Sequence, residues 1–200
     1  LGTPNACSDC HTDKSVQWSQ DAIVKWYGDD RHQGAHYAVA LHAGRVGSPD
    51  ALNRLRFLVR TPDQPDMAKA TALSLIERFA PASEVPEVVE SLSHPNALIR
   101  GAAVRSLVSS DPERQMALAL PLVKDEVLDV RIAASGIVSG HKYQITSEAM
   151  DEALAEAHQI WRDYHRANLD RPESQIQLAS LNIVLEDYAK AESYFQSALT

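Results

Sequence analysis

Small apolar residues follow a basic residue at three evenly spaced places between residues 51 and 140. Lys69, Arg100 and Arg131 open these segments, and successive members are 31 residues apart. A fixed period of this length is typical of stacked helix pairs. Small residues let neighbouring helices approach closely, and we expect the three basic side chains to bind a carbonyl or carboxylate group of a nearby turn. The pattern therefore predicts repeated helix pairs in which the basic residues have a structural role.

The pattern changes at Ser147, where it predicts one long amphipathic helix. Ser147 is suited to cap the helix N-terminus, and Leu154, Ala157 and Trp161 lie on one apolar stripe that we expect to pack on the last helix pair. An apolar-periodic segment near residues 36–46 predicts a helix that caps the other end of the array. We therefore expect an all-α fold of about ten to twelve helices and no sheet.

Residues 96–107 and 128–134 resemble short HEAT-like repeats, although their period is below the usual length of about 40 residues. The segment after Pro172 resembles a tetratricopeptide (TPR) repeat. The resemblance implies a right-handed α-solenoid of HEAT-like helix pairs that runs into a TPR repeat. The residues that carry the TPR resemblance are Leu178, Ala179, Ala191, Phe195 and Ala198.

The TPR match has two departures and is incomplete. Asn182 stands where an aromatic residue is usual, and Glu186 stands where a turn glycine is common. A lone repeat of this kind cannot bury its apolar face. We therefore expect the chain, which begins at Leu1, to be a piece of a longer protein.

The composition is that of a folded chain, with 200 residues of which 44% are hydrophobic. The net charge of −8 repels a phosphate backbone, which argues against a nucleic-acid partner. No stretch reaches the roughly eighteen consecutive apolar residues of a membrane span. No Ser/His/Asp constellation, phosphate-binding glycine loop or carboxylate pair is evident, so an enzymatic function has little support from the sequence.

Both cysteines lie in the segment Cys7-Ser8-Asp9-Cys10-His11, which has the C-x-x-C-H pattern that attaches a c-type haem. Two thiols at this spacing can add to neighbouring vinyl groups of a porphyrin, and the next residue places an imidazole under the iron. Three alternatives remain: a redox-active cysteine pair, a zinc site completed by a later histidine, and a coincidence of structural residues. A redox pair would be expected after a strand, and no strand pattern precedes Cys7.

A haem held by His11 needs a sixth ligand, and His32, His36 and His42 are the candidates. His36 is favoured because it opens an apolar-periodic run, where a rigid helix can hold it. The alternative for each candidate is an exposed histidine or one at a helix N-terminus. Trp18 and other nearby aromatic residues would suit packing against a porphyrin, or they belong to an ordinary core.

Residues 3–14, Trp18 and Trp26-Tyr27-Gly28, followed by the helical repeats, resemble bacterial multihaem c-type cytochromes with a C-terminal HEAT/TPR region. The resemblance implies covalent haem c, with Cys7 and Cys10 as anchors and His11 as the proximal ligand. It also implies His36 as the distal ligand and a periplasmic location.

The predicted organisation has three parts: a haem-attachment segment at 1–30, HEAT-like repeats at 31–145, and a linker helix with an incomplete TPR repeat at 146–200. The first hypothesis is an electron-transfer module joined to a scaffold that binds a protein partner, such as a redox partner. The alternative is a haem-free HEAT/TPR interaction scaffold in which the cysteines are free or bind zinc.

Overall fold

The computed structural model describes residues 6–29 and 36–199, and within these ranges the chain is all-helical with no strand. This confirms the all-α prediction and the expected number of helices. The α-helices are α1 (Ala6–Cys10), α2 (Val16–Tyr27), α3 (Tyr37–Val46), α4 (Ala51–Arg60), α5 (Asp66–Ile76), α6 (Pro86–Ser91), α7 (Ala97–Ser106), α8 (Pro112–Ala119), α9 (Leu128–Val138), α10 (Glu148–Arg166), α11 (Pro172–Val184) and α12 (Tyr188–Ala198). Three short 3₁₀ helices are η1 (Ala82–Glu84), η2 (Leu107–Ser109) and η3 (Leu120–Lys124).

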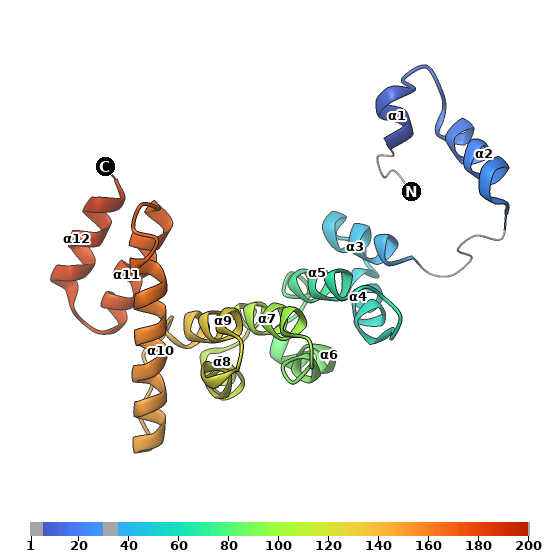
Figure 1. Cartoon of the computed structure of the whole chain (residues 1–200). Coiled ribbons are helices and arrows are strands. Elements are labelled where there is room, and N and C mark those ends of the chain that lie inside the picture. The colour runs from blue at the N-terminus through green and yellow to red at the C-terminus, as the bar shows by residue number, and fades with distance from the viewer. Residues whose placement is uncertain (1–5, 30–35, 200) are drawn as a thin grey trace.

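Helices α3 to α9 form two rows (Figure 1). Helices α3, α5, α7 and α9 pack side by side in chain order, while α4, α6 and α8 form the second row and pack against α5, α7 and α9. The long helix α10 packs on α9 and then contacts α11, which pairs with α12. None of the helices in the described ranges combines the length and the apolar composition needed to cross a membrane.

Small residues at the 31-residue spacing are buried in three helices of the first row. Ala72 in α5, Ala103 in α7 and Ala134 in α9 are all completely buried. Larger apolar side chains are buried in the same core, and they include Leu73, Ile76, Ile99, Leu107, Val130 and Val138. Small and large side chains together allow neighbouring helices to interdigitate at interior packing density.

Each of the three basic residues at the 31-residue spacing binds the turn that precedes its own helix. Arg100 donates a hydrogen bond of 2.8 Å to the carbonyl oxygen of His94. Lys69 and Arg131 make the equivalent bond, to carbonyl oxygens seven and six residues earlier, at 3.0 and 2.8 Å. These bonds confirm the predicted structural role of the three residues. Each basic side chain satisfies a carbonyl group that the turn leaves without a helical partner.

Arg100 also forms an ion pair that joins α7 to the turn before α9. Its guanidinium donates to both carboxylate oxygens of Asp125, at 2.8 and 2.9 Å, and the two side chains are only 8% and 7% exposed. The hydrogen bond from Arg100 holds the pKa of Asp125 below its usual value. Asp125 in turn accepts from the backbone N–H of Val127 at the start of α9. One bidentate pair therefore fixes α7, the turn before α9 and the first residues of α9.

The second row has its own connection at the repeat period. Glu87 in α6 is buried and accepts a 2.8 Å hydrogen bond from Arg56 in α4, which lies 31 residues earlier. Arg60 adds a second ion pair at 3.3 Å. Burial of Glu87 is compensated because two guanidinium groups lie beside its carboxylate.

The C-terminal helices begin and turn where the sequence indicates. The Ser147 hydroxyl accepts from the backbone N–H of Met150, so it caps α10 as predicted. Asn182 is buried in α11 and donates to the carbonyl oxygen of Leu178. Glu186 has a φ of +61°, which is the left-handed conformation that glycine adopts most easily.

Replacing Arg100 with methionine is expected to lower the free energy of unfolding by about 3 kcal/mol, because the Asp125 carboxylate would remain buried without its cation. The measurement is urea unfolding followed by circular dichroism. The control is Arg105→Met in the same helix, whose partner Asp129 is 64% exposed. Loss of that surface pair is expected to cost less than about 1 kcal/mol. Equal effects of the two substitutions would contradict the structural role of Arg100.

The ion pair also predicts a dependence of stability on pH. Because the pKa of Asp125 is lowered in the folded state, its contribution is present above the ordinary carboxyl pKa of about 4 and is lost as the pH falls through the lower folded value. We therefore expect Asp125→Asn to lower the melting temperature clearly at pH 7 and much less at pH 3. The control is Asp129→Asn, whose effect is expected to be small at both values. A constant difference between Asp125→Asn and wild type would exclude this linkage.

Candidate functional site

The C-x-x-C-H segment forms a single helical turn with its reactive groups accessible. Cys7 is half-buried and Cys10 is exposed, and both are free thiols on α1. His11 follows directly after α1 and is exposed, and its backbone N–H donates to the carbonyl oxygen of Cys7 at 2.8 Å. Residues four apart on such a turn share a face, so the turn brings Cys7 and His11 to one side.

One aromatic ring lies beside this turn, and two others lie at the C-terminal end of α2. The ring of Trp18 on α2 lies 4.8 Å from the ring of His11 at an angle of 55°. Helix α1 buries no residue and α2 buries only Ser19. Trp26 and Tyr27 are 68% and 71% exposed. The two N-terminal helices thus leave much of their apolar surface in contact with water within the described residues.

The donor set of this segment fits a covalently bound haem. Two accessible thiols and one accessible imidazole are present on one turn, and the uncovered aromatic surface is suited to the face of a porphyrin. A structural zinc ion would need four ligands in a tetrahedral arrangement. Within residues 6–29 and 36–199, no group of three or more His, Cys, Asp or Glu side chains is placed to hold a metal ion.

His36 lies at the N-terminus of α3, and its ring caps the helix. Its Nδ1 accepts a hydrogen bond of 3.2 Å from the backbone N–H of Ala38, and its ring lies 4.2 Å from the Tyr37 ring at an angle of 32°. Because Nδ1 accepts, the proton of the neutral ring is on Nε2. Iron ligation through Nε2 would therefore require the proton to move to Nδ1, which would release the cap.

The other candidates for the sixth ligand differ in position. His42 is half-buried within α3, and His32 lies outside the described residues. For His36, the sequence left open the alternative of a histidine at a helix N-terminus, and His36 lies at the N-terminus of α3. Its capping bond could be anticipated only from the helix boundary, because histidine is not among the usual capping residues.

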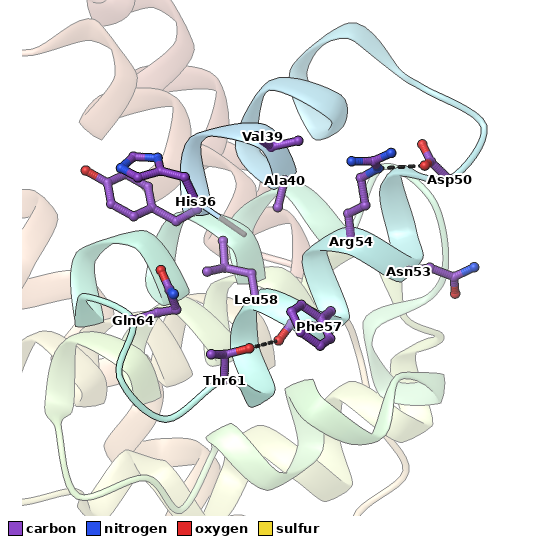
Figure 2. A pocket seen from close by; sticks show the side chains of 11 residues that line it. His36, Val39, Ala40, Asp50, Asn53, Arg54, Phe57, Leu58, Thr61 and Gln64 are labelled. Carbon is purple, nitrogen blue, oxygen red and sulfur yellow. Dashed lines mark hydrogen bonds and ion pairs between the residues drawn. The ribbon is translucent and has the colours of Figure 1, made fainter. Parts of the chain in front are cut away.

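His36 also stands at one side of a pocket of about 380 Å³ between α3 and α4 (Figure 2). Leu58 and Ala40 form part of its apolar lining, and Phe57 contributes a largely exposed ring. At the side opposite to His36, Arg54 and Asp50 are joined by an ion pair of 2.6 Å. The pocket can accept an apolar group beside a histidine and an arginine, and the sequence did not predict it.

A second pocket, of about 320 Å³, lies between α10 and the turn that joins α11 to α12. The hydroxyl of Tyr143 and Nε2 of His158 are buried there without a hydrogen-bond partner among the described residues. Burial raises the pKa of Tyr143 to about 12 and lowers the pKa of His158. Both groups are neutral at pH 7, so the pocket presents hydrogen-bonding atoms and no charge from these two residues.

Comparison of this chain with protein-family models, with curated proteins and with solved structures finds no match. The resemblances to multihaem cytochromes and to HEAT and TPR repeats are thus carried by the residues of the chain alone.

Proposed function

We propose that this chain is an electron-transfer module with a covalent c-type haem, joined to a helical scaffold that binds a protein partner. The observation that carries the proposal is the turn that holds Cys7, Cys10 and His11. Both thiols are free, the imidazole is accessible, and the Trp18 ring lies beside it. A haem would contact this aromatic surface and would accept and release single electrons.

The residues of the N-terminal segment have separate roles in holding the cofactor. The Cys7 and Cys10 thiols would add across the two vinyl groups, so that each sulfur forms a bond to carbon and the thiol proton is transferred to the neighbouring vinyl carbon. His11 would supply the imidazole that binds the iron. Attachment of this kind would imply a periplasmic location, where the maturation of c-type haems occurs.

His36 is the proposed ligand on the other face. Its place at the start of a rigid helix favours this role, and its cost is the loss of the bond between Nδ1 and the N–H of Ala38. A helix cap is worth about 1 kcal/mol, which is less than the contribution expected from an iron–imidazole bond.

The scaffold part of the proposal is a right-handed solenoid of HEAT-like pairs from α3 to α9, followed by a TPR-like pair in α11 and α12. The recurring bonds of Lys69, Arg100 and Arg131 support a true repeat, because the same contact occurs at the same place in each unit. Solenoids of this kind present extended surfaces to protein partners.

The haem is tested by exporting the chain in a bacterial host that has the machinery for c-type haem attachment. We expect the purified protein to show a cytochrome absorption spectrum and to retain haem on a denaturing gel, because thioether bonds survive denaturation. The control is the double variant Cys7→Ala, Cys10→Ala, which is expected to be colourless. A colourless wild-type protein would overturn the haem proposal and favour the haem-free scaffold.

The sixth ligand is tested by His36→Asn in the haem-loaded protein. Asparagine keeps the ability to cap α3, so the helix remains stable while the imidazole is lost. The spectrum is expected to change from low-spin to high-spin, because the iron loses a strong-field ligand. His42→Asn is the matched control and should leave the spectrum unchanged. A low-spin spectrum in His36→Asn would assign the sixth position to another residue.

A further inference from the structure

A third pocket, of about 540 Å³, opens on the first row of helices, far along the chain from the C-x-x-C-H turn. Helices α5, α7, α9 and α10 all contribute to it, so the pocket spans several repeats. Its lining includes Glu77, Arg105, Asp129, Gly136, Trp161 and Tyr164. Apolar side chains such as Val108, Ile132 and Ile137 make up much of the remainder.

Glu77 brings a negative charge to this pocket that the described residues do not neutralise. It is half-buried at the C-terminal end of α5, and its carboxylate has no hydrogen bond or ion pair among the described residues. Burial raises the pKa of Glu77, and no neighbouring cation opposes that effect. A carboxylate is also unfavourable at the C-terminus of a helix, where the helix dipole is negative.

The nearby arginine side chains already bind other groups. Arg105 binds both carboxylate oxygens of Asp129 at 2.6 Å. The guanidinium of Arg78 donates to the carbonyl oxygen of Gly44 at 3.1 Å. The pocket therefore contains one neutralised pair and one surplus negative charge.

The aromatic rings of α10 line the other end of this pocket, because α7 and α9 lie between α10 and the helix that carries Glu77. Trp161 and Tyr164 are stacked, with their ring centroids 6.2 Å apart. A Cβ atom at Gly136 would lie 2.7 Å from the Trp161 ring, so this glycine is what allows the indole to lie against α9. A guanidinium group can form two hydrogen bonds with the Glu77 carboxylate, while the apolar and aromatic lining is suited to the neighbouring side chains of the same segment.

We propose that this pocket is a docking site for an arginine side chain in an apolar segment of a partner protein. The volume exceeds that of a single guanidinium group, and the apolar lining is suited to the side chains on either side of the arginine. The net charge of −8 favours a basic partner. This inference rests on the protein-binding part of the proposed function and is independent of the haem.

The test is isothermal titration calorimetry of the whole chain with the peptide acetyl-Leu-Arg-Leu-amide. The comparison peptide has citrulline in place of arginine, which keeps the shape and removes the charge. We expect the arginine peptide to bind at least about tenfold more tightly, because the charged hydrogen bond to Glu77 is lost with citrulline. Glu77→Gln is expected to remove this preference.

Two controls separate the pocket from general effects. Glu90→Gln, in the exposed last turn of α6, changes the net charge equally and should keep the preference. The melting temperature of Glu77→Gln should be equal to or higher than that of wild type, because the substitution removes a desolvated, unpaired charge. A lowered melting temperature would contradict the description of Glu77 as unpaired.

Equal binding of the two peptides, or an unchanged preference in Glu77→Gln, would overturn the proposal. Arginine amide binding as tightly as the peptide would also overturn it, in favour of a small cationic ligand. The titration is carried out on both haem-free and haem-loaded protein. If the arginine peptide shows no preference, the absorption test of the haem still stands. If the protein is colourless, the titration still tests the docking site.

Discussion

The bond between a basic side chain and the turn before its own helix is the contact on which the arrangement of α5, α7 and α9 depends. An alanine lies one turn after each basic residue, as Ala103 does after Arg100, and it is completely buried. The cation fixes the turn, and the turn fixes the angle at which the helix enters the row. A neutral residue would leave buried carbonyl groups without donors.

The sequence predicted this contact because its chemistry is local. Arg100 and the carbonyl group of His94 are six residues apart, and the position recurs every 31 residues. The cap of α10 is equally local, because the Ser147 hydroxyl accepts a hydrogen bond from a backbone N–H three residues later. The all-helical fold, the 31-residue spacing and the cap of α10 could therefore be inferred from the sequence, since each depends on local patterns of residues.

Contacts between distant residues were not predictable in the same way. Asp125, the partner of Arg100, occupies the repeat position that His94 holds one unit earlier, so the period gave no reason to expect a carboxylate there. The bond between His36 and Ala38 depends on where α3 begins, and a helix boundary is the least certain feature of a sequence-based prediction. The arginine pocket brings together Glu77 and Trp161, which are 84 residues apart and share no motif.

The two halves of the proposed function draw on different sources of stability. Helices α3 to α10 contribute to one continuous core, whereas α1 and α2 bury almost nothing among the described residues. A cofactor at Cys7, Cys10 and His11 would supply the apolar surface that those two helices lack, without any change in the contacts of Arg100 or Ala103. The docking face remains formed whether or not the haem is attached, because its helices are held by the repeat core. Attachment of the haem and recognition of a partner can therefore vary independently, and each can be altered by substitutions that leave the other intact.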